Sequence, residues 1–280
     1  MSDFELVSSD DDQVSVGGGS RSVEVPPFGN LRPFFKGRLF WSPQASHWIL
    51  ALMALATGTA VFVLLWGSIR FTDPNLLHSQ LMTQLPDIVV LLLALICSVF
   101  LLLTSLTNPG IVPKGSALSS FSSSPVSEYC STLQFCMMCQ IHRPSLAGHC
   151  RRCNNCVAQF DHHCRMLGCC IGELNRRYFL LFLCAITGYN VAISLFLIYF
   201  LAAVTPSEST LRYVLFSFTL AVTLVLCMIF AGYLAHNLRL IRMGLLHREF
   251  MKGVPARTRG RGSFFTNLFQ VLFPKRDSSD

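Results

Sequence analysis

Cysteine and histidine side chains are concentrated between Phe135 and Gly172, a stretch that holds eight of the 12 Cys and four of the eight His. Thiolate and imidazole are ligands that Zn²⁺ prefers, usually four to a site. Cysteines separated by two residues suit a tight turn around one metal, and Cys136 with Cys139 and Cys150 with Cys153 have this spacing. The stretch therefore predicts zinc binding.

The number of ligands indicates how many metals the stretch holds. Eight side chains suffice for two tetrahedral sites: Cys136, Cys139, His149, Cys150, Cys153, Cys156, His163 and Cys170. Sites closed by four protein ligands are structural rather than catalytic. This assignment leaves over Cys164, Cys169, His142 and His162. The alternative for the same cysteines is a disulfide framework, which requires an oxidising compartment.

Cys164 is a candidate nucleophile because Asp161 and His162 lie next to it in the sequence. An imidazole that takes the thiol proton, oriented by a carboxylate, activates a cysteine for attack. Successive side chains of an extended strand point to opposite faces, so one of His162 and His163 can bind zinc while the other serves Cys164. The alternative is a purely structural zinc finger with a spare thiol.

The run C-x2-C-x9-H-C-x2-C-x2-C-x4-D-H-H-C-x5-C resembles the cysteine-rich domain of the Asp-His-His-Cys (DHHC) family of membrane-bound protein S-acyltransferases, or palmitoyltransferases. The resemblance implies that Cys164 accepts the acyl group, that His162 is the base and that Asp161 orients it. It also implies two zinc ions with separate ligand sets. The first set is Cys136, Cys139, His149 and Cys156, and the second is Cys150, Cys153, His163 and Cys170.

Three shorter motifs extend the resemblance beyond this domain. Asn108-Pro109-Gly110 is similar to the family's Asp-Pro-Gly motif, and the segment from Asn267 is similar to its C-terminal motif with an asparagine. Near Glu249 the family has Thr-Thr-x-Glu, where this chain has Leu246 and His247 in place of the threonines. After Cys164 the family continues Pro-Trp, where this chain has Arg165 and Met166. The segment before the first span resembles plant-type and fungal Ras-acylating members.

The composition predicts a multi-pass membrane protein. The chain is 52% hydrophobic and 13% charged, with a mean hydropathy of +0.49, which is too apolar for an ordinary soluble protein. About 20 apolar residues cross a bilayer, and four stretches qualify: residues 47–69, 88–106, 179–204 and 213–235. The expected fold is therefore an all-α bundle of four transmembrane helices, with the two-zinc domain between the second and the third.

The distribution of charge predicts the orientation. Arginine and lysine crowd the middle loop and the segment after the fourth span, whereas the two other links are short and nearly uncharged. The positive-inside rule then places both termini and the zinc domain on the cytosolic side of the membrane. The membrane itself is expected to be that of the Golgi or the endoplasmic reticulum, or the plasma membrane. The net charge of +7 is spread beside the spans, so the zinc motif does not indicate nucleic-acid binding.

The chain divides into six segments. Residues 1–27 are too polar to bury a core and are expected to be disordered, and residues 28–46 mix aromatic and basic side chains typical of a membrane interface. Apolar residues recur every three or four positions near 263–273, which predicts an amphipathic surface helix, with a helix packed in the cytosol as the alternative. The six segments are 1–27, 28–46, the spans in 47–106, the zinc domain 107–178, the spans in 179–235, and 236–280.

The predicted reaction is transfer of a long acyl chain from palmitoyl-CoA, through a thioester on Cys164, to a cysteine of a cytosolic or membrane-associated protein. Each buried methylene contributes about 0.8 kcal/mol, so a pocket among the helices would hold the chain. Four arginines are candidates for the CoA phosphates: Arg151, Arg152, Arg176 and Arg177. The alternatives are a zinc-dependent membrane adaptor with little catalytic activity, and a small transporter, which the lack of charge pairs within the spans disfavours.

Overall fold

The structure, a computed structural model, describes residues 28–35, 39–72, 80–114, 134–203, 210–254 and 262–274. Four long helices dominate it: α1 (Ser46–Thr72), α2 (Gln80–Leu106), α4 (Arg176–Ala203) and α5 (Thr210–Met243). All four are long and apolar enough to cross a membrane, since 27 residues of helix measure about 40 Å against a hydrocarbon core of about 30 Å. The predicted four-helix membrane fold is confirmed.

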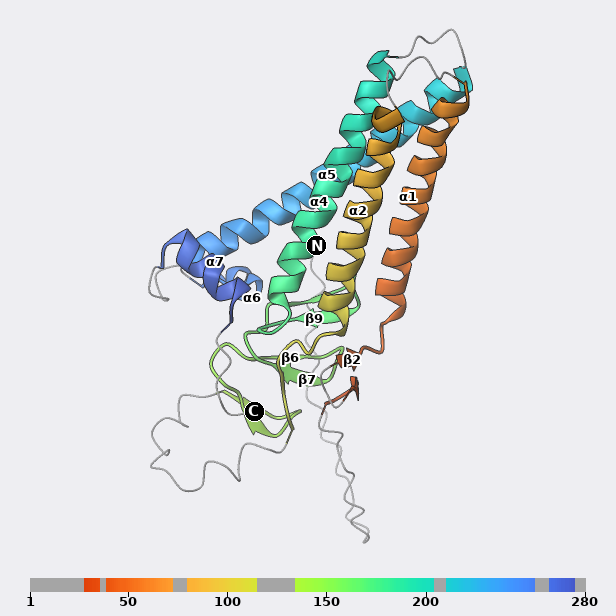
Figure 1. The fold of residues 1–280 in the computed structure, drawn as a ribbon. Coiled ribbons are helices and arrows are strands. Elements are labelled where there is room, and N and C mark those ends of the chain that lie inside the picture. The colour runs from red at the N-terminus through yellow and green to blue at the C-terminus, as the bar shows by residue number, and fades with distance from the viewer. Residues whose placement is uncertain are drawn as a thin grey trace, which may run out of the picture.

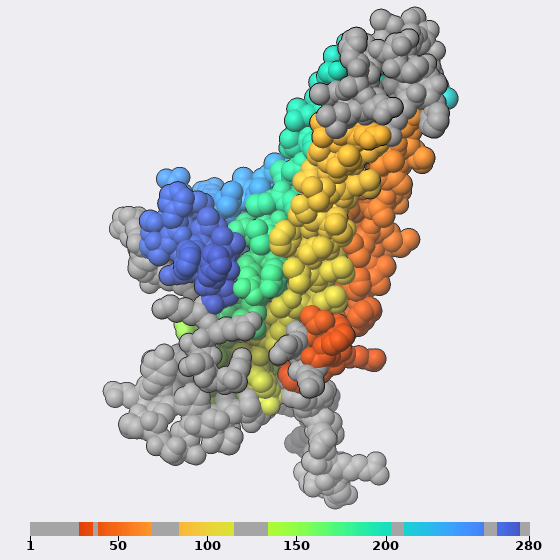
Figure 2. Space-filling view, in the orientation of Figure 1, coloured from red at the N-terminus to blue at the C-terminus, as the bar shows by residue number. Residues whose placement is uncertain are grey.

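The helices form an elongated bundle in which α4 packs against both α2 and α5, and α1 packs against α2. In Figure 1, α1, α2 and α4 run side by side, whereas α5 leaves them obliquely and carries α6 (His247–Met251) and α7 (Phe264–Leu272) at its far end. Figure 2 shows α1 in orange, α2 in yellow and α4 in green packed closely along one face. The outward-facing side chains include the exposed Leu50, Leu64 and Leu92, as expected of surfaces that meet lipid.

The helices extend beyond the predicted apolar limits. Helix α2 begins at Gln80 rather than near Ile88, and α4 begins at Arg176 rather than Phe179. Helix α5 continues to Met243, well past Ala235. Hydropathy identifies only the apolar part of a helix, which suits lipid. It does not include the polar turns that extend each helix into the aqueous phase.

Between α2 and α4 the chain forms short antiparallel hairpins. Strands β4 (Phe135–Cys136) and β5 (Ile141–His142) pair with each other, as do β8 (His162–Cys164) and β9 (Cys169–Ile171). A third sheet has the order β3-β7-β6, with β3 (Ile111–Val112), β6 (Gly148–Cys150) and β7 (Asn155–Val157). Because β3 follows α2 directly, this sheet ties the cysteine-rich region to the end of that helix.

The Asn108-Pro109-Gly110 motif forms the turn that joins α2 to β3. The side-chain oxygen of Asn108 accepts hydrogen bonds from the backbone N–H groups of Gly110 and Ile111 at 2.8 and 2.9 Å. Gly110 has φ = 98°, a conformation that glycine adopts at little cost. The asparagine therefore supplies the acceptor that an aspartate would supply in the same turn.

The segment before α1 forms a hairpin that the sequence analysis did not predict, β1 (Arg32–Phe34) with β2 (Leu39–Trp41). Leu31 and Phe40 are buried against Cys150, Cys153 and Cys170 of the cysteine-rich region. On the other side, Phe35 and Trp41 are exposed. The hairpin thus packs on the cysteine-rich region and also presents aromatic side chains outward.

Helix α7 has the amphipathic character expected of residues 263–273. Ser263 caps its N-terminus by accepting a hydrogen bond from Thr266 N–H, and Phe265, Phe269 and Phe273 are exposed. Asn267 donates to the carbonyl of Ile241 in α5 at 2.9 Å. Asn267 therefore ties the helix to α5 while Phe265, Phe269 and Phe273 remain uncovered. Residues 1–27, which were expected to be disordered, lie outside the described residues.

Candidate active site and metal centres

The first cluster of possible metal ligands consists of Cys136, Cys139, His149 and Cys156, whose donor atoms all lie within 4.8 Å of one another. Nδ1 of His149 is 3.6, 3.3 and 3.9 Å from the sulfurs of Cys136, Cys139 and Cys156. Neighbouring donors in a tetrahedral zinc site lie about 3.5 Å apart, given zinc–sulfur distances of about 2.3 Å. Both the donor set and its spacing fit one Zn²⁺.

The second cluster contains Cys150, Cys153, His163 and Cys170. Here Nδ1 of His163 is 3.6, 3.5 and 3.6 Å from the sulfurs of Cys150, Cys153 and Cys170. The other ring nitrogen of His163 is 2.9 Å from Oε1 of Gln44. An acceptor in this position fixes the tautomer of a metal-binding histidine and strengthens it as a ligand, so this cluster also fits Zn²⁺.

Both clusters are built in the same way. In each, the histidine lies ten residues after the second cysteine, and the last cysteine lies seven residues after the histidine. The histidine and the last cysteine face each other across a hairpin, His149 opposite Cys156 and His163 opposite Cys170. A residue with positive φ follows each cysteine pair, Gln140 (55°) and Asn154 (51°), and turns the chain back around the site.

The second hairpin, β8–β9, separates the metal cluster from the candidate nucleophile. His163 and Cys170 face the cluster, so His162 and Cys164 lie on the other face of the strand. There Cys164 is 6% exposed and joins the hydrophobic core of the helix bundle together with Cys169 and Ile171. Cys169, directly opposite Cys164 in the hairpin, is buried as well. The unliganded thiol therefore lies where the cysteine-rich region meets the membrane helices.

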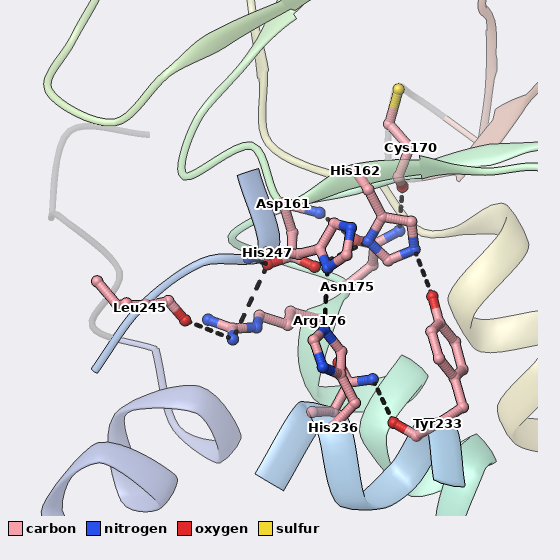
Figure 3. Close-up of polar contacts among 11 residues, drawn as sticks. Asp161, His162, Cys170, Asn175, Arg176, Tyr233, His236, Leu245 and His247 are labelled. Carbon is pink, nitrogen blue, oxygen red and sulfur yellow. Dashed lines mark hydrogen bonds and ion pairs between the residues drawn. The ribbon is translucent and has the colours of Figure 1, made fainter. Parts of the chain in front are cut away.

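Asp161 and His162 form a hydrogen-bonded pair beside this thiol. Oδ2 of Asp161 is 2.8 Å from Nδ1 of His162, and its other oxygen accepts the backbone N–H of His247 at 2.8 Å. Arg176 lies 3.9 Å from the same oxygen. Figure 3 shows Asp161 at the centre of these contacts, which come from β8, the start of α4 and the segment after α5.

The environment stabilises the charged forms of both groups. Burial alone would raise the pKa of Asp161, but the hydrogen bond from His162 and the charge of Arg176 lower it to about 2. Burial alone would lower the pKa of His162, but its hydrogen bonds with Asp161 and with the Cys164 side chain raise it to about 9. Since Asp161 holds Nδ1, Nε2 is the ring nitrogen available to the Cys164 thiol. The arrangement suits removal of the thiol proton by His162.

The segment after α5, where the family has two threonines, contacts Asp161 through its backbone. The backbone N–H of His247 supplies the contact to Asp161, and Glu249 accepts the N–H of Leu246 at 2.8 Å. His247 also lies 3.2 Å from Nε2 of His236 in α5. A backbone donor does not depend on which side chain the residue carries, so this contact to Asp161 forms with histidine at position 247.

Residues of the loop after Cys164 line an apolar cavity of about 360 Å³. The cavity lies among the helices, and its lining includes Leu55 and Gly58 from α1, Met166 and Leu167 from the loop, Ile186 from α4 and Phe230 from α5. Ser42 donates to the carbonyl of Gly168, and a hydrogen bond joins Nδ1 of His47 to the carbonyl oxygen of Arg165. Ser42 before α1 and His47 in its first turn therefore position the loop that stands where the family has Pro-Trp.

The four arginines proposed for phosphate binding lie on two different elements. Arg151 and Arg152 are exposed in the turn between β6 and β7. Arg176 contacts Asp161 and the carbonyl of Leu245, and Arg177 stacks on the ring of Tyr178 at 4.6 Å. A cleft of about 400 Å³, lined in part by Arg143, Arg248 and Lys252, was not predicted. These cations are brought together by chain segments about a hundred residues apart, a proximity that sequence spacing does not reveal.

Comparison with known proteins agrees with these observations. Residues 130–254 match the family described as DHHC palmitoyltransferase. The chain is 29% identical over 203 residues to probable protein S-acyltransferase 5 of Arabidopsis thaliana, covering 65% of this chain and 42% of the relative. It is 28% identical over 212 residues to human palmitoyltransferase ZDHHC18, covering 69% and 50%. A Dictyostelium discoideum protein, putative ZDHHC-type palmitoyltransferase 1, is 30% identical over 162 residues, covering 54% and 36%.

The chain spans about half or less of the length of these relatives. The matched residues nevertheless include both Cys₃His clusters, the Asp161–His162–Cys164 group and the two helices that follow them. From this match, the ligand clusters and the four spanning helices, we conclude that residues 130–254 form a DHHC palmitoyltransferase domain within a four-helix membrane protein.

Proposed function

We propose that the protein is a membrane-bound S-acyltransferase that carries a long acyl chain on Cys164. The observation that supports this most strongly is the position of the Cys164 thiol. It lies outside both metal clusters, in contact with the His162–Asp161 pair, at the boundary between the cysteine-rich region and the helix bundle. The relatives named S-acyltransferases and palmitoyltransferases support the same function.

In the first step, the thiol proton passes from Cys164 to Nε2 of His162 while Asp161 holds Nδ1. The Cys164 sulfur attacks the thioester carbon of the acyl-CoA, and the bond from that carbon to the CoA sulfur breaks. The leaving CoA thiolate takes the proton from Nε2, so one thioester is exchanged for another. Such an exchange needs no further energy source, and ping-pong kinetics are expected.

In the second step, a cysteine thiol of the target protein gives its proton to Nε2 and attacks the Cys164 thioester. Cys164 leaves as a thiolate and recovers the proton from His162. The Zn²⁺ ions take no part in these two steps. When bound to the two clusters, they would stabilise the fold of a region whose separate cores contain few apolar side chains.

The apolar cavity among the helices is the proposed site of the acyl chain. Its lining includes Met166 and Leu167, which follow the nucleophile closely in the sequence, so a chain attached to Cys164 has direct access to it. Each methylene buried there contributes about 0.8 kcal/mol. Palmitoyl-CoA is the proposed acyl donor.

The cleft that Arg143, Arg248 and Lys252 line is the proposed site of the CoA phosphates. It adjoins the catalytic group because Leu246, which also lines the cleft, precedes the residue that contacts Asp161. Three cations in one cleft suit a ligand with several phosphate groups. Arg176 instead lies 3.9 Å from the carboxylate of Asp161, so its charge already has an acidic partner within the protein.

A cytosolic position for both termini and for the zinc domain follows from the charge distribution. In this orientation the reactive thiol meets acyl-CoA and the cysteines of cytosolic or membrane-associated proteins, which are the proposed partners. Golgi, endoplasmic reticulum and plasma membrane all satisfy this orientation.

The experiment that tests this function is incubation of the purified full chain with an alkynyl palmitoyl-CoA, followed by mapping of the label to a peptide. We expect label on the peptide containing Cys164, released by hydroxylamine, and none in Cys164→Ala. Cys169→Ala provides the matched control because it removes the thiol directly opposite, and it should retain the label. Absence of label from the zinc-loaded wild type would favour a catalytically inactive membrane adaptor.

A further inference from the structure

Tyr233 of α5 lies at the nitrogen of His162 that faces the nucleophile. Its hydroxyl oxygen is 3.3 Å from Nε2, the same nitrogen that Cys164 uses, because Asp161 occupies Nδ1. Figure 3 shows the ring of Tyr233 rising from α5 with its hydroxyl directed at His162. Whenever Nε2 carries no proton it is an acceptor, and the Tyr233 hydroxyl is then the donor of this hydrogen bond.

Aromatic packing fixes the position of this hydroxyl. The Tyr233 ring meets Phe179 edge-on, with centroids 6.0 Å apart, and Phe179 in turn meets the His162 ring edge-on at 5.4 Å. Phe179 is buried in the same core as Cys164, and Tyr233 packs against that core. A donor held in this way needs little reorganisation when charge develops beside it, which is the condition for effective electrostatic stabilisation.

His247 also lies near the base, but on the side of Asp161. Its backbone N–H donates to Asp161, and its ring nitrogen Nδ1 contacts His236. These contacts engage the residue away from Nε2. Among the residues that the structure describes, the Tyr233 hydroxyl is thus a donor on the Nε2 side of His162, the side it shares with the thiol.

Given the proposed acyl transfer, on which this inference rests, we propose that Tyr233 is a further catalytic residue whose hydroxyl donates a hydrogen bond to the thioester oxygen of the acyl substrate. Once Nε2 has taken the proton of Cys164, it no longer accepts from Tyr233. The hydroxyl is then free to turn to the oxygen that becomes negative as sulfur adds to the carbonyl carbon. When the carbon–sulfur bond to CoA breaks, the carbonyl forms again, and Tyr233 keeps its proton throughout.

The test compares two reactions of the same thiol in the full-length protein with Tyr233→Phe. Formation of the acyl-enzyme from palmitoyl-CoA passes through an oxyanion, whereas alkylation of Cys164 by iodoacetamide does not. Removal of one oxyanion donor costs about 100- to 1,000-fold in rate. We expect single-turnover acylation to fall by about 100-fold, with alkylation of the Cys164 peptide unchanged within about twofold or faster, since Nε2 loses a competing partner.

Tyr199→Phe is the matched control because Tyr199 is exposed on α4, and it should leave both rates unchanged. An equal fall of both rates in Tyr233→Phe would show that the tyrosine only maintains the site, and unchanged acylation would exclude the role outright. If the wild type itself formed no acyl-enzyme while its Cys164 was still alkylated, the proposed function would fail, and the role of Tyr233 with it.

Discussion

The two Cys₃His clusters have the same ligands, order and spacing, but the hairpins that carry them present different residues on their opposite faces. In the first, His149 and Cys156 face their own cluster, while the neighbouring Cys150 belongs to the second cluster. In the second, His163 and Cys170 face their cluster, while the neighbouring Cys164 is the candidate nucleophile. One architecture thus serves two purposes.

This difference means that the second cluster positions the thiol directly, whereas the first acts on the thiol only through the second. The first positions a hairpin that supplies a ligand to the second, and the second positions the hairpin that carries the thiol and its base. Strand alternation makes this arrangement possible, because adjacent residues of a strand serve opposite faces. Damage to the second cluster should therefore affect the chemistry more than equal damage to the first.

The largest effect should come from a change that leaves both clusters intact. In Asp161→Asn the carboxylate that holds Nδ1–H of His162 is lost, and the base no longer has a fixed tautomer. By analogy with the aspartate of other catalytic triads, acyl-enzyme formation should fall by about 1,000-fold or more. Zinc content should remain that of the wild type.

Glu173→Gln is the control for this change, because Glu173 contacts Gln159 rather than the catalytic group. It should behave as the wild type in both assays. Loss of zinc from Asp161→Asn would mean that the two faces of the second hairpin are not independent.

An intermediate effect should distinguish the clusters directly. Cys170→Ala and Cys136→Ala each remove one sulfur ligand, and each should reduce the zinc content by one ion. Misplacement of a reacting group by about 1 Å costs about 100-fold, so Cys170→Ala should lose at least that much acylation. Cys136→Ala should lose less than about tenfold. Equal losses, measured by single-turnover acylation and metal analysis, would contradict the more direct role of the second cluster.

The smallest effect concerns Gln44, which accepts a hydrogen bond from Nε2 of His163. Removal of such a partner typically weakens metal binding by about 10- to 100-fold. Gln44→Ala should speed zinc release to a chelator by about tenfold when introduced into Cys136→Ala, where only the second cluster is loaded. In Cys170→Ala, where only the first cluster holds zinc, Gln44→Ala should not change the rate of zinc release. In Cys136→Ala, Gln44→Glu in place of Gln44→Ala should restore slow release.

Much of this organisation is predictable from local sequence. The ligands of each cluster lie within about twenty residues of one another, so spacing alone indicates them, and four apolar stretches indicate four spanning helices. Asp161 and His162 are likewise close to Cys164 in sequence. In such cases the chemistry depends on residues that are close along the chain, so the spacing of motifs and the length of apolar stretches are sufficient to predict it.

The remaining parts of the site come from distant segments. Tyr233 meets His162 across 71 residues, Gln44 meets His163 across 119, and Arg248 meets Ala147 across 101. Nothing in the local pattern marks a tyrosine in an apolar helix as a partner of the base. Arg176, which the sequence offered as a phosphate contact, also lies 3.9 Å from Asp161, a partner that its charge alone did not indicate. Such contacts depend on tertiary packing that one sequence does not encode locally.

The most direct test of the central claim is the zinc content of purified Cys164→Ala compared with that of the wild type. If eight side chains hold two metals and the sulfur at position 164 is free, both proteins should contain two Zn²⁺ per chain. Loss of a zinc ion from Cys164→Ala would make that sulfur a metal ligand, and it would contradict the account.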